Sequence, residues 1–503
     1  MSPLPRTLNV AEVTTVSSRI QDVFSSSLEW FVYRTWTPTT ETAERLALSM
    51  LSKMQKGRLT INVLTSSESH AHTFGVPTDI QVPEDEPVAE FVVRSPAFWL
   101  RLISSGSLGF AEAFMYGDVD ITNQDMFAVF NLYIINKSYL TTSSSIPRAL
   151  TNPLAYYLVT LPQAWLNTSA QLANTSNTRS NVAAHYDISN DMFATFLSTD
   201  MTYSCGVSTK AELEMFDLNL NQLVGPLFES QLRKLRLIIS KANIETGHRV
   251  LEVGTAAQTT GCKVDTLTLS SEQAALARER IHAAGLDDLV TVHLFDYRLA
   301  PLQFDPPAPG SSDEKGVSWR GLFDRFVAIE MVEHVGKDFL PEFFHTVGQC
   351  LKPKGHDAVG VIQLSTLPEA RMPNYINDVE FIQKWLFPGC FVPSVTQLVS
   401  ALEAGTTGDL IIDSILNIGN HYGPTLRAWR ERFEDKFDVP GGIRNTLLQR
   451  YPDLDEDAVE VFCRKWLYFY IYSEFGFTEK LVGVHILRFT REGNKAVGYV
   501  PDV

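Results

Sequence analysis

The sequence predicts an α/β protein with a Rossmann-like, doubly wound sheet and a helical lid, preceded by a smaller α+β domain. From about residue 240, strand-like and helix-like segments alternate, which is typical of a parallel sheet covered by helices. Short β-branched runs between about 57 and 95 predict a separate small sheet. A stretch rich in Ser, Thr, Asn and Pro lies between the two regions. We therefore expect an N-terminal domain at 1–136, a linker at 137–180 and the larger domain at 181–503.

The N-terminal region combines helices with short strands. Apolar residues at three- and four-residue steps predict a helix that ends in "ERLALSMLSKMQKGRL". The runs "GRLTINVL", "DIQVPED" and "AEFVVRS" predict the small sheet. A second helix is expected from Ser95, as its N-cap, and Pro96, as its first residue, to Gly106.

The larger domain should contain strands in "HRVLEVGT", "CKVDTLTL", "LVTVHLFDY" and "FDRFVAIEMVEHVG". The helix "SSEQAALARERIHAAG" follows the second strand, with Ser270 as N-cap, Gln273 completing a capping box and Gly285 at its end. The lid is expected from "PNYINDVEFIQKWLFPG" and "WLYFYIYSEFGF". Ligands of such sheets bind at the carboxyl ends of the strands, so residues just after each strand are candidates for a site.

Composition excludes several classes of function. The 58 acidic and 42 basic side chains give a formal charge of -16, so no partner among nucleic acids is expected. No segment reaches the roughly 20 apolar residues of a membrane span, and the N-terminus lacks the pattern of a secretory signal. The five cysteines never form a CxxC pair, which argues against a disulfide framework or a zinc knuckle. We expect a cytoplasmic protein without a metal site.

The apolar segment "PLAYYLVTLPQAWL" at 153–166 has two interpretations, a contact with a membrane surface or a short buried helix. The buried helix is the simpler of the two. A peripheral position on membranes is nevertheless compatible with the sequence, and so is a homo-oligomer.

The strand that ends in "LEVGT" places Glu252 and Gly254 where a nucleotide-like ligand could approach the backbone closely. This signal is weak alone. The segments "TLTLSSEQ", "FDYR" and "AIEMVEHVG" follow at the strand ends where an S-adenosylmethionine-dependent methyltransferase builds its pocket. An α/β domain for another nucleotide stays open as the alternative.

Five longer segments carry a resemblance to a known family. They are "AAHYDISNDMFATFLSTDMTYSCGV" (183–207), "TLTLSSEQAALARERI" (266–281), "FDRFVAIEMVEHVG" (323–336), "FIQKWLFPGCFVPS" (381–394) and "NIGNHYGPTLRAWRERF" (417–433). They resemble the cyclopropane-fatty-acyl-phospholipid synthases and the mycolic acid cyclopropane synthases. Weaker similarity in "GSLGFAEAFMYGDVDI" (106–121) extends the resemblance into the N-terminal domain.

The resemblance implies S-adenosylmethionine as cofactor and an unsaturated phospholipid acyl chain as partner. A methyl or methylene group would pass to the double bond and give a cyclopropane or a methyl-branched chain. An alkene is a poor nucleophile, so the reaction needs a dry, apolar channel, a stabilised carbocation and then a base. Aromatic faces suit the cation.

The base in this family is a bicarbonate ion, and the resemblance implies that Cys205, Glu333 and Tyr422 help to hold it. Without their motifs, the three residues would be a buried thiol, a helix cap and a packing residue. Gln363 stands where the best-known members have histidine. Because an amide does not change charge near neutral pH, Gln363 can hold an anion but cannot relay a proton.

The resemblance also implies cofactor ligands. The usual acidic ribose ligand is absent from the end of the second strand, where "TLTLSS" has none, and a glutamine is its natural substitute. The implied ligands are Tyr203 and Ser204 at the methionine end, Gly254 at the first strand, Thr268, Leu269 and Gln273 at the ribose, Asp296 and Tyr297 at the adenine, and Ile329 at the sulfonium.

One departure from the family lies in the connection after the first strand. The family has a Gly-Trp-Gly-like loop and about three turns of helix there, whereas "EVGT" here runs directly into "AAQTTGCKVDTLTL". A crossover between parallel strands ordinarily needs a dozen or more residues. Either about eight residues are skipped in the gene or the protein has lost the loop, and the pocket for the methionine end is impaired in both cases.

Two other functions remain open at this stage. One is a small-molecule C-methyltransferase of secondary metabolism with the same fold. The other is a non-catalytic relic that binds lipid or a partner and no longer binds the cofactor.

Overall fold

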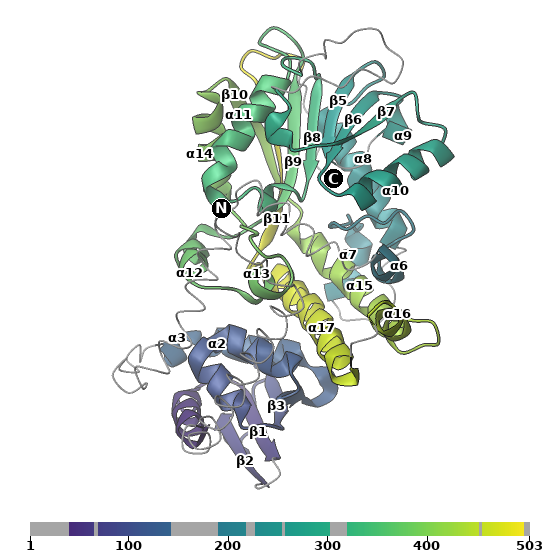
Figure 1. The fold of residues 1–503 in the computed structure, drawn as a ribbon. Coiled ribbons are helices and arrows are strands. Elements are labelled where there is room, and N and C mark those ends of the chain that lie inside the picture. The colour runs from purple at the N-terminus through teal and green to yellow at the C-terminus, as the bar shows by residue number, and fades with distance from the viewer. Residues whose placement is uncertain are drawn as a thin grey trace, which may run out of the picture. The chain divides into compact units, whose positions relative to one another are not determined.

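The computed structural model describes residues 40–64, 69–141, 190–217, 227–253, 257–301, 319–451 and 455–496. The chain divides into two compact units, Met1–Leu150 and Thr151–Val503. Each is shown in Figure 1 and described by itself here. The segment 153–166 and the linker from residue 142 onward lie outside the described residues.

The N-terminal unit contains a four-stranded sheet with the strand order β2-β1-β3-β4. Strand β1 pairs antiparallel with β2 and parallel with β3, and β3 pairs antiparallel with β4. Alternate residues of β1 and β3 such as Ile61, Val63 and Phe91 are buried, as expected for a sheet with one covered face. The strands are β1 (Arg58–Leu64), β2 (Ser69–Gly75), β3 (Val88–Val93) and β4 (Val119–Ile121).

Three helices accompany this sheet: 40–51, α2 (Ala97–Met115) and α3 (Met126–Thr141). The predicted small sheet is thus confirmed, but the predicted strand in "DIQVPED" is wrong: those residues form turns and irregular structure, and Ser69–Gly75 pairs with β1 instead. The expected end of the second helix is wrong as well. Gly106 has φ 55° and marks a kink, after which the helix resumes to Met115. Helix α3 runs to Thr141, five residues past the expected end of the domain at 136.

The larger unit is built on a seven-stranded sheet with the order β10-β11-β9-β8-β5-β6-β7. Neighbouring strands from β5 to β9 are parallel, which confirms the predicted doubly wound sheet. Two antiparallel strands, β10 and β11, extend it beyond β9 and were not predicted. The strands are β5 (Arg249–Val253), β6 (Lys263–Thr268), β7 (Val290–Leu294), β8 (Arg325–Ile329), β9 (Val359–Thr366), β10 (Leu410–Asn417) and β11 (Gly483–Arg491).

Helices pack around this sheet (Figure 1). Helix α11 packs on α14, and Phe343, Phe344 and Leu398 from the two helices enter the main core. Helices α15 and α17 also pack on each other, and α6 contacts α15. The helices are α6 (Asn190–Phe196), α7 (Lys210–Asp217), α8 (Leu227–Ala242), α9 (Ala257–Thr260), α10 (Ser271–Ala283), α11 (Leu340–Cys350), α12 (Met372–Asn377), α13 (Phe381–Trp385), α14 (Val395–Thr406), α15 (Tyr422–Phe437), α16 (Ile443–Arg450) and α17 (Glu456–Thr478).

Helix α10 begins as predicted, with the Ser270 side chain accepting a hydrogen bond from the backbone N–H of Gln273. Gly285 follows its end with φ 66°. The predicted return bond of the capping box is not formed. The Gln273 side chain instead accepts a hydrogen bond from Thr268 Oγ1, which also accepts one from the Ser270 backbone N–H.

The short connection from β5 to β6 does not separate the two strands. They pair in parallel, and the only helix between them in the described part of the chain is the four-residue α9. Gly254 itself lies outside the described residues. None of the helices in the described ranges is both long enough and apolar enough to cross a membrane.

Candidate active site

A partly buried carboxylate, Glu330, is the centre of a hydrogen-bonded cluster at the end of strand β8. Its Oε1 accepts hydrogen bonds from the backbone N–H of Cys205 (3.2 Å) and from Gln363 Nε2 (3.0 Å). Its Oε2 accepts one from the Tyr422 hydroxyl (2.9 Å). Gln363 Nε2 also donates to Ser204 Oγ at 3.1 Å. Three residues from separate segments, Cys205, Gln363 and Tyr422, thus donate to one carboxylate.

The sheet explains how these segments meet. Gln363 lies on β9 opposite Ile329 of β8, so Glu330 directly follows the last residue of β8 that this pairing includes. Glu330 has φ 51°, a left-handed conformation that non-glycine residues rarely adopt. Such strain concentrates at functional sites, where the surrounding structure holds it in place. Tyr422 is the first residue of α15 and reaches the cluster from the helical side.

Glu333 lies apart from these donors. Its Oε1 accepts a hydrogen bond from the Ser365 backbone N–H at 2.7 Å, and its Oε2 is buried with no hydrogen-bond partner among the described residues. Burial and the neighbouring Glu330 carboxylate raise the pKa of Glu333 to about 8. Glu333 is therefore mostly a neutral carboxylic acid at neutral pH.

The surroundings of Glu330 favour a different protonation state. Burial raises the pKa of Glu330, and the buried Lys234 ammonium together with the hydrogen bonds from Cys205 and Tyr422 oppose that rise. Donors aimed at both oxygens stabilise the ionised form. Glu330 thus accepts three hydrogen bonds on its two oxygens, whereas Glu333 accepts one, so the geometry favours the charge of the pair on Glu330 and lets the two neighbouring carboxyls take different roles.

Aromatic rings surround the hydroxyl side of the cluster. Tyr422 stacks on Phe477 with centroids 4.5 Å apart and meets Trp429 edge-on at 6.0 Å. Tyr203 lies 5.1 Å from both Trp429 and Phe193. These rings come from α15, α17 and α6, together with the segment that carries Cys205. They form a mostly apolar wall in which a developing cation would face π-electron density.

The sequence profile of the mycolic acid cyclopropane synthetase family matches residues 173–485. The chain belongs to this family. It is therefore an S-adenosylmethionine-dependent methyltransferase, as its sequence predicts.

Relatives at full length are similar as well. The chain is 32% identical to a tuberculostearic acid methyltransferase of Mycobacterium tuberculosis over 412 residues, 80% of this chain and 83% of that protein. It is 29% identical to the cyclopropane-fatty-acyl-phospholipid synthase of Escherichia coli, over 76% of this chain and 82% of that protein. A solved coclaurine N-methyltransferase shares the fold, with 15% identity, a TM-score of 0.51 and coverage of 76% of this chain and 98% of that one.

Two glutamines, Gln231 and Gln363, contact Ser204, one of the residues expected at the methionine end of the cofactor. Gln231 Nε2 donates to the carbonyl of Ser204 at 2.7 Å. The buried Oε1 atoms of Gln231 and Gln363 have no hydrogen-bond partner among the described residues. Buried acceptors normally find donors, and an ammonium group would supply them. At the ribose end, Thr268 and Gln273 are paired at the carboxyl end of β6.

The other cofactor residues implied by the family resemblance are placed differently. Asp296 accepts two hydrogen bonds from the Arg298 guanidinium, at 2.9 and 2.7 Å, so its carboxylate is already engaged. Tyr297 packs edge-on against Phe343 of the main core at 5.6 Å. Leu269 and Ile329 are half-buried. The structure thus pairs Thr268 with Gln273 but directs the Asp296 and Tyr297 side chains into protein contacts.

The bicarbonate ion implied for this family does not fit the cluster. The donors expected to hold it, Cys205, Gln363 and Tyr422, already donate to the carboxylate of Glu330. A second anion among them would meet the Glu330 charge and find those hydrogen bonds occupied.

Glu330 was missed in the sequence, although it stands in the same motif, "IEMVEHVG", three residues before Glu333. The available signal was an acidic residue immediately after a buried strand, at the edge of the sheet where ligands bind.

Proposed function

We propose that this methyltransferase acts on the double bond of an unsaturated fatty acyl chain that is still attached to a phospholipid. The observation that carries the proposal is a wall of packed aromatic rings next to a carboxylate. The rings are Tyr422, Phe477, Trp429 and Tyr203, and the Tyr422 hydroxyl donates a hydrogen bond to Glu330. Two relatives support a fatty acyl substrate, since one is a tuberculostearic acid methyltransferase and the other a cyclopropane-fatty-acyl-phospholipid synthase.

The chemistry follows from this arrangement. S-adenosylmethionine supplies an electrophilic methyl group. The alkene must meet it without competing water, which the packed rings exclude. The aromatic faces of Tyr422, Tyr203 and Trp429 stabilise the carbocation that remains on the acyl chain. A base then removes one proton.

The identity of that proton sets the product. Loss of a proton from the transferred methyl group, with the C–H electron pair closing onto the cationic carbon, gives a cyclopropane. Loss of a proton from a neighbouring carbon of the chain gives a methyl-branched alkene. Both products arise from the same cation, so the two relatives with different products are compatible with one site.

We propose a division of labour between the two units. Methyl transfer belongs to the larger domain, expected at 181–503, which contains Glu330 and the aromatic wall. The N-terminal domain, expected at 1–136, helps the enzyme to engage phospholipid, and 137–180 link the two.

The test supplies the purified chain with millimolar S-adenosylmethionine and vesicles of mono-unsaturated phospholipid. Fatty acids released afterwards are analysed by mass spectrometry, and we expect a gain of one CH2 unit on the unsaturated chains. Saturated phospholipid is the matched control. If label from the cofactor's methyl group appeared only on free small molecules, the phospholipid proposal would be wrong. If it appeared on nothing while the folded protein bound lipid, the non-catalytic interpretation would replace it.

A further inference from the structure

We infer that Glu330 takes the place of bicarbonate and is the base of the reaction, an inference that rests on the proposed function. The donors that would hold a free anion are directed at its two carboxylate oxygens at 2.9–3.2 Å. The Glu330 carboxylate, which is part of the protein, thus takes the place of the separate bicarbonate ion that the resemblance implies.

Three features equip Glu330 for this role. Three donors reach the two oxygens of Glu330, whereas the Glu333 carboxyl accepts one hydrogen bond, so the donors favour the negative charge of the pair on Glu330. Glu330 directly follows strand β8, at the edge of the sheet where ligands of such folds bind. The Tyr422 hydroxyl that donates to it belongs to the ring that stacks on Phe477, so the base adjoins the wall that stabilises the cation.

The step balances without another reagent. Methyl transfer breaks the S–C bond of the sulfonium, forms a C–C bond with one alkene carbon and leaves the positive charge on the other. Glu330 removes a proton from the new methyl group, and the electrons of that C–H bond form the third bond of the ring. The carboxylate becomes a carboxylic acid and releases its proton to water before the next turnover.

The experiment compares wild type, Glu330→Gln and Glu330→Ala in buffer freed of CO2 and in buffer with added bicarbonate. We expect wild-type turnover to be independent of bicarbonate, and Glu330→Gln to lose about two to four powers of ten, the usual scale for a positioned acid–base group. Glu330→Ala vacates the space among the donors, so bicarbonate should restore part of its activity. Glu403→Gln, on the exposed surface of α14, controls for the change of charge.

The outcomes separate the inference from the proposed function. Wild-type product that forms only with bicarbonate would overturn the role of Glu330 while leaving the acyl substrate intact. Full activity of Glu330→Gln without bicarbonate would overturn it as well. No acyl product from wild type under any condition would contradict the proposed function itself.

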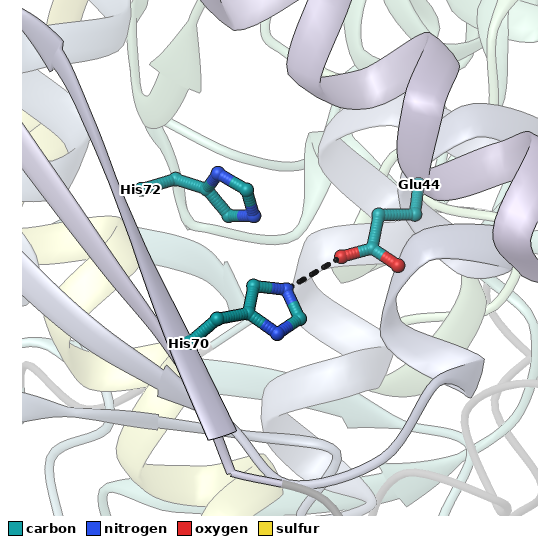
Figure 2. Close-up of side chains that lie close together, drawn as sticks. All are labelled: Glu44, His70 and His72. Carbon is teal, nitrogen blue, oxygen red and sulfur yellow. Dashed lines mark hydrogen bonds and ion pairs between the residues drawn. The ribbon is translucent and has the colours of Figure 1, made fainter. Parts of the chain in front are cut away.

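A second inference comes from the N-terminal unit and is independent of the chemistry above. We infer that Glu44, His70 and His72 form a binding site for a divalent transition metal, with Zn²⁺ the best match (Figure 2). One ligand atom from each residue can be chosen so that all three lie within 4.8 Å of one another. The cysteine pattern gave no sign of this site, because it contains no cysteine.

The geometry follows from the secondary structure. His70 and His72 are two residues apart on strand β2, so both rings project from the same face, toward the helix at 40–51 that carries Glu44. His70 Nε2 lies 3.4 Å from Glu44 Oε1. His72 Nε2 is buried and has no hydrogen-bond partner among the described residues, which is unusual for a ring nitrogen without a ligand.

The donor set suits zinc. Two imidazole nitrogens and one carboxylate oxygen bind Zn²⁺ at about 2.0–2.2 Å, with a water as the fourth ligand. Neutral imidazole is the form of histidine that binds the metal. Because β2 is an edge strand of its sheet, a metal here would fasten that edge to the helix and stabilise the N-terminal unit.

The test measures Zn²⁺ binding to the full chain by calorimetry, and the visible absorption of Co²⁺ as a report of coordination geometry. We expect one equivalent bound, a tetrahedral Co²⁺ spectrum and a higher unfolding temperature with zinc. His72→Ala and Glu44→Gln should each weaken binding at least tenfold, as loss of a direct ligand does. His356→Ala, at an exposed position, is the matched control.

Circular dichroism of each variant without metal checks that the fold is intact. Equal zinc binding by wild type and His72→Ala would overturn the site, and so would a wild-type chain that binds no zinc. An octahedral Co²⁺ spectrum, together with unchanged zinc affinity in His72→Ala and Glu44→Gln, would show that the metal binds to other residues of the chain.

Discussion

Gln363 and Glu330 are joined by two hydrogen bonds of opposite direction across strands β9 and β8. The Glu330 backbone N–H donates to the Gln363 carbonyl at 2.7 Å, and the Gln363 side-chain amide donates to the Glu330 carboxylate at 3.0 Å. The first bond holds the strained backbone of Glu330, and the second orients its carboxylate. Gln363 therefore acts as a positioning residue for the carboxylate rather than as a ligand of a separate anion.

The first prediction concerns this amide. Gln363→Leu removes the hydrogen bond that the amide donates to the Glu330 carboxylate. A hydrogen bond to a charged group contributes about 1.5–3 kcal/mol, so kcat should fall roughly ten- to a hundredfold. Loss of the donor also raises the pKa of Glu330, and the acidic limb of the pH–rate profile should move to higher pH. Gln363→His retains an N–H and should keep most of the activity. An unshifted profile in Gln363→Leu would show that the amide only packs.

The alternation of strands and helices was sufficient to predict the parallel sheet and its ligand-binding edge. The antiparallel strands β10 and β11 were missed because long helical segments separate each of them from its partner in the chain, so their pairing depends on tertiary contacts. The resemblance grouped Cys205, Glu333, Gln363 and Tyr422. In the structure Cys205, Gln363 and Tyr422 meet at Glu330, whereas Glu333 accepts its hydrogen bond from Ser365.

The centre of that group was missed for a physical reason. Glu330 and Glu333 are three residues apart, and their roles depend on which donors reach each carboxylate through tertiary contacts. No local pattern encodes that Tyr422 reaches the former and that the Ser365 backbone reaches the latter. The zinc ligands were overlooked in the same way, since Glu44 and His70 meet only after the helix packs on the sheet.

The second prediction concerns the pH dependence of stability. The pKa of Glu333 is about 8 in the folded protein, well above the 4.5 of an exposed Glu. Between these two values the folded state holds a proton that the unfolded state has lost, so the free energy of unfolding should fall as pH rises from about 5 to 8. The contribution of one such group is about 1.4 kcal/mol per pH unit.

Urea denaturation at pH 5, 6, 7 and 8 measures this slope. Glu333→Gln cannot ionise and can still accept the hydrogen bond from Ser365, so its unfolding free energy should fall less steeply with pH than that of the wild type. Parallel slopes for the two proteins would mean that Glu333 is ionised in the folded state.

The third prediction concerns the connection between β5 and β6. The four-residue helix α9 offers few free backbone N–H groups, whereas a longer helix after a glycine-rich loop would direct several at the ligand. We expect weak binding of S-adenosylmethionine by the chain as it stands, measured by calorimetry. Inserting about eight residues of a glycine-rich loop after Thr255 should tighten binding. A low-micromolar Kd for the unaltered chain would contradict this expectation, and an insertion of equal length in the exposed turn at Gly493 is the control.

The last prediction concerns contact with membranes. With a formal charge of -16 the protein as a whole is repelled by an anionic surface, so binding to phospholipid must be local and largely apolar. Apolar contacts are insensitive to screening, whereas attraction to headgroup charges weakens as salt shortens the Debye length. We expect reversible sedimentation with vesicles of unsaturated phospholipid that changes little between low and high salt. A larger fraction of anionic lipid should weaken the binding to vesicles, because the acidic protein is repelled by the headgroups. Added salt should reduce this repulsion. If moderate salt abolished the binding to vesicles, the protein would instead have a basic surface that contacts the headgroups. Methylation of the acyl chain would then depend on headgroup charge as well as on chain unsaturation.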